Sequence, residues 1–170
     1  MKTNACRLLD SLGIRYETRE YTVDPDDLSG QTVARKIGLA PEQVFKTLLS
    51  RVDHDRTVFA VLSVADELDF KKLAAAAGGR RAELVPLHEV QPLTGYIRGG
   101  VTVFGSKKPF PVFADESLEL CDVISVSAGM RGLQVLLAPA DYLRASGAQL
   151  ADLTRSSAGA QPPAHPGAAQ

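Results

Sequence analysis

The chain has 170 residues, a formal net charge of −1 and 45% hydrophobic residues. This length fits one domain, and the composition is that of a globular protein, which excludes wholesale disorder. No apolar run reaches the roughly 20 residues needed to cross a bilayer, and the near-neutral charge is not that of a typical nucleic-acid-binding protein. We expect a cytoplasmic protein in which any RNA binding depends on a local basic patch.

The first half of the chain predicts helices interspersed with strands. Apolar residues at i, i+3, i+4 and i+7 from Ala5 predict a first helix that ends at Gly13, and two β-rich runs joined by a polar turn predict a hairpin. In chain order, we predict a helix over 3–12, a strand over 14–21, a loop over 24–30, a helix over 31–37, hairpin strands over 44–49 and 58–64, and a helix over 70–77.

The second half is dominated by strands. We predict strands over 82–85, 101–104, 110–114, 122–127 and 133–138, a short helix over 86–91, and a last helix that starts at Pro139. Residues 156–170 offer almost nothing to bury, so they predict a disordered tail behind a domain of residues 1–155. The irregular order of helices and strands indicates an α+β fold with a largely antiparallel sheet, open or closed into a barrel.

The sequence offers no metal site and no nucleotide-binding loop. Cys6 and Cys121 have no metal-type spacing and are interpreted as reduced thiols, with a disulfide as the alternative. His54, His88 and His165 have no ligand set beside them. We therefore expect no cofactor and no metal, and a hydrolase of this composition would act by positioning and electrostatics.

Lys46 stands in the otherwise apolar strand Val44–Leu49, interrupted only by Thr47. Strand alternation places Lys46 on the same face as Val44 and Leu48. A lysine on an apolar face requires an anionic partner or an open cavity. The alternative is a lysine that faces water on an edge strand, where it would prevent aggregation.

Two glycine-containing segments follow. Residues 94–105 include four glycines, which allow close backbone approach to a ligand and leave N–H groups free to donate; a hairpin loop without further function is the alternative. Residues 127–133 form a turn in which Arg131 could reach a phosphate or simply lie at a solvated tip. Arg98, Lys107 and Lys108 flank the first segment and could supply local positive charge for RNA.

These segments together resemble one family. Phe45–Leu49, Thr94-Gly95-Tyr96 with Gly99-Gly100, and Ser127–Leu133 occur in this order and spacing in the YbaK/EbsC family. Further similarity lies at residues 21–25 and 68–72, and the match extends over about residues 4–153. The resemblance implies a mixed, largely antiparallel β-barrel with surrounding helices, similar to the inserted editing domain of bacterial prolyl-tRNA synthetase.

The resemblance also implies trans-editing, which is hydrolysis of the ester of mischarged tRNA, with Cys-tRNA(Pro) as the expected substrate and Ala-tRNA(Pro) as an alternative. Mischarged tRNA and prolyl-tRNA synthetase are the implied partners. The implied catalytic residues are Lys46, Gly99 and Gly100, and the implied substrate-binding residues are Tyr21, Ser29, Thr47, Thr94, Gly95, Tyr96, Thr102, Ser127, Gly129 and Arg131.

The sequence departs from the family in two places. The family reads Gly-Gly-x-Ser-Pro-x-Gly where this chain has Thr102 and Val103 in place of Ser-Pro, and Ser29 replaces an aromatic residue before Gly30. Both changes concern the preference for cysteine more than the deacylation itself. A binding module without activity, and a lyase that acts on the cysteinyl ester, are the competing hypotheses.

Overall fold

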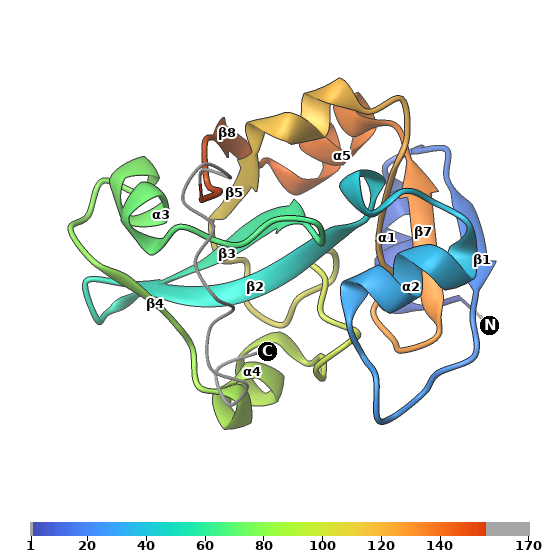
Figure 1. Cartoon of the computed structure of the whole chain (residues 1–170), viewed down its shortest axis with the longest axis horizontal. Coiled ribbons are helices and arrows are strands. Elements are labelled where there is room, and N and C mark those ends of the chain that lie inside the picture. Colours follow the sequence, from blue (N-terminus) through green and yellow to red (C-terminus); the bar gives the residue numbers. More distant parts are fainter. Residues whose placement is uncertain (1, 156–170) are drawn as a thin grey trace.

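Two β-sheets form the frame of the protein. The computed structural model describes residues 2–155, which fold into five α-helices, two short 3-10 helices and eight strands arranged around a shared core (Figure 1). The larger sheet has the order β4-β2-β3-β5-β8 and the smaller has the order β1-β7-β6.

The larger sheet is built on a long hairpin. β2 (Phe45–Val52) pairs antiparallel with β3 (Arg56–Ser63) over its whole length, and β4 (Ala82–Leu84) pairs with the far end of β2. β5 (Val112–Asp115) and β8 (Gln149–Ala151) extend the sheet in parallel on the other side. The half of β2 that carries Lys46 therefore has β3 on one side and is not covered by β4 on the other.

The smaller sheet comprises β1 (Glu17–Glu20), β7 (Leu133–Leu137) and β6 (Ile124–Ser127), all antiparallel. One isolated bridge, between Val44 and Ser125, joins its edge to the larger sheet. Side chains from both sheets, including Phe45 and Val126, pack into one main core. The start of β2 and the edge of β6 are thus held side by side.

The helices cover these sheets and end at defined caps. They are α1 (Asn4–Ser11), α2 (Gly30–Ile37), α3 (Phe70–Ala76), α4 (Leu87–Thr94) and α5 (Pro139–Ser146). Thr3, Ser29 and Asp69 accept N-cap hydrogen bonds for α1, α2 and α3, as their short polar side chains favour. In Figure 1, α2 crosses in front of β7. The end of α2 is bonded to the smaller sheet, because Arg19 Nη1 of β1 donates to the carbonyl of Ile37 at 2.8 Å.

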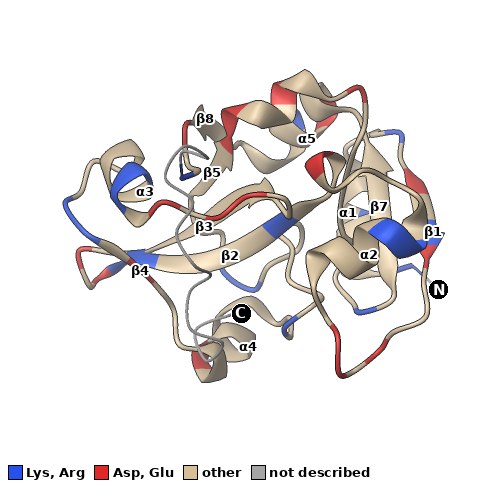
Figure 2. Cartoon of the chain, in the orientation of Figure 1, with Lys and Arg blue, Asp and Glu red and all other residues tan. Residues whose placement is uncertain are grey.

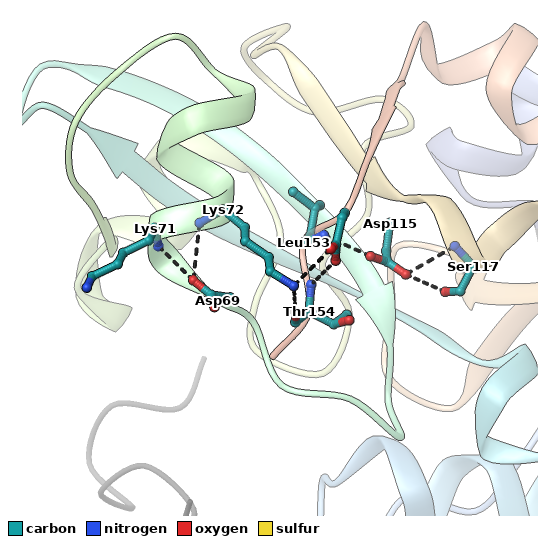
Figure 3. Close-up of polar contacts among 8 residues, drawn as sticks. Asp69, Lys71, Lys72, Asp115, Ser117, Leu153 and Thr154 are labelled. Carbon is teal, nitrogen blue, oxygen red and sulfur yellow. Dashed lines mark hydrogen bonds and ion pairs between the residues drawn. The ribbon is translucent and has the colours of Figure 1, made fainter. Parts of the chain in front are cut away.

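The segment after β8 is tied to the larger sheet by a polar network (Figure 3). The buried Asp115 carboxylate accepts the Leu153 N–H at 2.9 Å and the Ser117 hydroxyl at 2.5 Å. Lys72 Nζ donates to Thr154 O at 2.6 Å, and the Asp69 N–H donates to Leu153 O at 2.8 Å. Residues 153–154 are therefore integral to the fold.

The predicted α+β fold is confirmed, with three corrections. Closure of the strands into a barrel is not found among residues 2–155, which form two sheets. The predicted strand over 101–104 is a loop, because its apolar side chains are buried without a pairing partner. β8 was not predicted. The predicted tail over 156–170 lies outside the described residues, and the domain boundary at 155 stays a prediction.

Neither the distribution of charge nor the hydropathy of the helices points to a particular function. Figure 2 shows acidic and basic residues interspersed over the elements in this view. Within residues 2–155, no helix has the length and apolar character that a membrane span requires. Cys6 and Cys121 are both free thiols, as expected.

Candidate active site

A cavity of about 620 Å³ opens where the two sheets meet. Its walls come from five parts of the chain: residues 26–31 and 33 around the start of α2, residues 44–48 at the start of β2, Val64 after β3, the turn with Arg98, Gly99 and Val101, and the facing ends of β6 and β7. Pockets of this size hold small ligands in most proteins. The cavity brings together segments far apart in the sequence.

Lys46 lies in the wall that β2 supplies. Its Nζ donates a hydrogen bond to Asp66 O at 2.8 Å, and its side chain is largely buried. Burial lowers the pKa of the Lys46 ammonium, and the carboxylates of Glu67 and Asp66 act in the opposite direction. The ammonium keeps donor capacity beyond its one carbonyl partner, so it can bind an oxygen-rich group in the cavity. Lys46 does lie on the stretch of β2 that β4 leaves uncovered, but its part-buried and hydrogen-bonded side chain does not fit the alternative of a lysine that simply faces water.

Gly99 lies in a tight turn that supplies another part of the cavity wall. The Gly100 N–H donates to Ile97 O at 2.9 Å, and Gly99 has φ +87°. A positive φ at the third residue of such a turn is the type II arrangement, which favours glycine. Among residues 2–155, no acceptor is found for the Gly99 N–H, and Gly99 lines the cavity. Gly99 is therefore a free donor there, whereas Gly100, expected to donate as well, uses its N–H within the turn.

Arg131 fixes this turn through a hydrogen bond to its backbone. Its Nε donates to Arg98 O at 2.7 Å. Because the C=O and N–H of a trans peptide point in opposite directions, fixing the Arg98 carbonyl also fixes the direction of the Gly99 N–H. A Cβ on Gly99 would lie 3.3 Å from Arg131 Cγ, so the two residues are in close contact. Arg131 supports the cavity wall without lining it.

The wall at α2 depends on a close approach between this helix and Val64, the residue that follows β3. The first helical residue is Gly30, and a Cβ there would lie 2.2 Å from Val64 Cγ1. Before it, the Asp27 carboxylate accepts the Thr32 hydroxyl at 2.6 Å and the Ser29 N–H at 3.1 Å. Hydrogen bonds from Thr32 and Ser29 lower the pKa of Asp27, so this loop is held in shape by a charged acceptor.

The structure brings five of the thirteen predicted site residues to the cavity wall: Lys46, Gly99, Ser29, Thr47 and Ser127. The other eight do not line it, and the hydroxyls of two of them bond within the scaffold. Tyr96 Oη donates to Phe104 O at 2.6 Å, and the Thr94 hydroxyl donates to Val90 O at 2.8 Å. Those eight are Gly100, Tyr21, Thr94, Gly95, Tyr96, Thr102, Gly129 and Arg131.

The altered loop is held by the buried side chain of Thr102. This side chain is 1% exposed, and its Oγ1 accepts the Phe104 N–H at 3.3 Å. A serine hydroxyl at this position could accept the same bond, so the threonine preserves the local turn. The departure from the family motif therefore leaves the Gly99 turn in place.

Sequence reasoning missed Gln134. It lies on β7, is 5% exposed and lines the cavity. The signal was available, because Gln134 is the one polar residue in the strand Leu133–Leu137, just as Lys46 is the cation in an apolar strand. Within the part of the chain described, no group of His, Cys, Asp or Glu is arranged to hold a metal ion.

A two-sheet α+β domain with a lysine and a glycine N–H donor at one cavity has the donors that a ligand-binding or hydrolytic protein needs at its site. The chain belongs to the aminoacyl-tRNA editing domain family, whose model matches residues 25–145. The resemblance to the YbaK/EbsC family seen in the sequence is thereby confirmed.

Relatives and solved structures agree with this assignment. The chain is 39% identical to EbsC of Enterococcus faecalis, a candidate Cys-tRNA(Pro)/Cys-tRNA(Cys) deacylase, over 90% of this chain and 93% of the relative. It is 33% identical to the multifunctional Ser/Thr-tRNA deacylase ProXp-y of Escherichia coli K12, over 74% and 78%. A crystal structure of a candidate trans-editing enzyme for prolyl-tRNA synthetase has the same fold, with TM-score 0.77, 24% identity, and coverage of 92% and 99%.

Proposed function

We propose that this protein is a trans-editing aminoacyl-tRNA deacylase that hydrolyses the ester of mischarged tRNA in the cytoplasm, with Cys-tRNA(Pro) as the first substrate to test. The observation that carries the proposal is that Lys46 and Gly99, from two distant segments of the chain, line one cavity. The family and the names of its relatives support the reaction class.

The proposed roles follow from the donors on the two walls. The Lys46 ammonium binds the acylated 3′ end of the RNA, and the Gly99 N–H donates to the ester carbonyl as it becomes negative. One such donor contributes on the order of 3 kcal/mol to lowering the barrier. The ester of an aminoacyl-tRNA is already activated, so positioning and charge stabilisation suffice for attack by water or, in a cysteinyl ester, by the substrate thiol.

A second, separate site is needed because a synthetase pocket distinguishes small side chains by only about 1 to 3 kcal/mol. The cavity of about 620 Å³ has room for a terminal nucleoside with a small amino acid. The formal net charge of −1 gives no broad RNA-binding surface. We therefore propose prolyl-tRNA synthetase as the partner that supplies tRNA identity.

The test is a panel of Cys-, Ala- and Ser-tRNA(Pro), with release of the amino acid measured for wild type, Lys46→Ala and Lys71→Ala. Loss of a charge-assisted hydrogen bond predicts a fall of about tenfold to a hundredfold in kcat/KM for Lys46→Ala. Lys71 is exposed and remote from the cavity wall, so its variant serves as the matched control. Equal rates for all three proteins would show that Lys46 takes no part in the reaction.

The same panel separates the competing hypotheses. Binding of mischarged tRNA without turnover of any substrate would identify a binding module. Free cysteine as the product indicates hydrolysis or thiol-assisted release, whereas pyruvate-type fragments indicate a lyase. Addition of prolyl-tRNA synthetase should sharpen the preference for tRNA(Pro), and an unchanged preference contradicts the proposed partnership.

A further inference from the structure

Gln134 places a buried amide on the inner wall of the cavity. Its neighbours on β7, Val135 and Leu133, pack on the main core, so strand alternation turns Gln134 to the opposite face. That face also carries Ser127, which is directly opposite in the β6–β7 register, and Ser125. The wall is thus polar over three neighbouring side chains, although Gln134 is 5% exposed and Ser127 is 9% exposed.

One end of this amide is held and the other is free. The Ser125 hydroxyl donates to Gln134 Oε1 at 2.8 Å, with Ser125 fully buried. Within residues 2–155, Gln134 Nε2 has no hydrogen-bond partner, and it is not among the fully enclosed unpaired polar atoms. Because Gln134 lines the cavity, the small exposed part of its side chain faces that space. The amide N–H groups are therefore unpaired donors at the cavity, available to a ligand.

The position of Gln134 indicates which part of a substrate it meets. Lys46 and Gly99 are more exposed than Gln134 and Ser127, so they lie nearer the solvent side. If Gly99 holds the ester carbonyl, the RNA extends outward and the amino acid extends inward. The cavity wall also includes Val33, Val44 and Val101, which suit a small apolar body. The α-ammonium of the substrate has only donors and cannot pair with an N–H group.

We propose that Gln134 contacts the side chain of the aminoacyl group. It favours a hydroxyl-bearing side chain, as in seryl or threonyl esters, over the methyl group of an alanyl ester. The proposal rests on the deacylase function above and names the substrate class of that site. A hydroxyl can accept from Gln134 Nε2 and donate in turn, whereas a methyl group leaves the amide without a partner. An unpaired buried polar group costs free energy, so alanyl esters are disfavoured.

The experiment compares Ser-tRNA(Pro) with Ala-tRNA(Pro), which differ by one oxygen atom, as a ratio of kcat/KM. We expect Gln134→Leu to lower the serine-to-alanine ratio about threefold to tenfold, the size of one neutral hydrogen bond. The double variant Ser125→Ala with Gln134→Leu removes the hydroxyl that the single variant leaves unpaired, and it should show the same fall. Gln149→Leu, exposed on β8, is the matched control with an unchanged ratio.

The ratio separates recognition from structural damage, because a loss of folded protein affects both substrates equally. An unchanged ratio in a folded Gln134→Leu or double variant, or an equal fall on both substrates, would overturn the proposal while leaving the deacylase function intact. Wild type that hydrolyses neither ester would overturn the role of Gln134, and failure on Cys-tRNA(Pro) as well would overturn the deacylase function. A preference of wild type for the alanyl ester would overturn the role of Gln134 alone.

Discussion

At Lys46, burial disfavours the charged form of the side chain and so opposes the stability of the fold. The side chain is held in the wall of the cavity by one carbonyl, and burial lowers the pKa of its ammonium. In the unfolded chain the same group has its ordinary pKa, so between the two values the unfolded state binds more protons. Stability therefore rises with pH through this window, and the charged lysine destabilises the fold below it.

We accordingly predict that Lys46→Met raises the free energy of unfolding at pH 7 by on the order of 1 kcal/mol, since an apolar side chain removes a buried charge. The gain should shrink as the pH approaches 10.5, the ordinary lysine value. Urea unfolding at pH 7 and pH 10 measures both effects, and Lys71→Met is the exposed control. A less stable Lys46→Met at pH 7 contradicts the prediction.

Arg131 acts through Gly99, and its contribution should differ from that of Gln134. Arg131→Met keeps the aliphatic stem and loses the bond to Arg98 O. We predict that kcat/KM falls about threefold to tenfold on seryl and alanyl esters alike, because the turn is loosened while the inner wall is unchanged. Arg80→Met, exposed elsewhere, should have no effect. A changed serine-to-alanine ratio would show that Arg131 meets the amino acid itself.

Among the elements, α2 helps to set the size of the cavity because it approaches Val64, just after β3, without space for a side chain at Gly30. A Cβ there would lie 2.2 Å and 2.6 Å from two Val64 carbons, so Gly30→Ala must displace the helix. We predict a destabilisation of about 1 to 3 kcal/mol, typical of overpacking, together with a raised KM. The double variant with Val64→Ala restores space and should recover most of the loss. Additive effects of the two changes in thermal unfolding and in KM would contradict this account.

Elements set by local patterns could be predicted from the sequence. The i, i+3, i+4 spacing from Ala5 and the polar turn after Val52 correspond to α1 and the β2–β3 hairpin. β8 could not be predicted, because Gln149–Ala151 is short and pairs in parallel with β5, which precedes it by more than thirty residues. Val101 and Phe104 suggested a strand, but they are buried in a loop. Tertiary packing there overrides local preference.

The candidate site was predicted in part for a related reason. Lys46 and Gly99 stood out because a cation in an apolar strand and a glycine cluster are local signals. Thr94 and Tyr96 belong to a matching motif, yet their hydroxyls bind backbone carbonyls within the scaffold. A motif that has to be kept for folding looks the same in a sequence as one that touches a ligand. Only the arrangement in space separates the two.

At the scale of the whole molecule, Asp115 anchors the segment after β8 to the larger sheet. This carboxylate is 3% exposed and accepts bonds from Leu153 and Ser117. We predict that Asp115→Ala destabilises the protein by about 2 kcal/mol, because it leaves buried donors unpaired, and lowers Tm by about 6 °C. Lys72→Ala breaks a partly exposed contact and should cost less than about 1 kcal/mol. Equal losses for the two variants in a thermal melt would contradict the prediction.

The isolated bridge between Val44 and Ser125 has a consequence for how substrate range could change. It is the one β-bridge that joins the two sheets within residues 2–155, so few backbone bonds fix the angle at which they meet. The volumes of core side chains packed between them, such as Leu49 and Val126, then help to set how wide the cavity opens. A lineage could therefore acquire a larger or smaller amino-acid preference by resizing these hidden side chains, with every residue that touches the substrate left as it is.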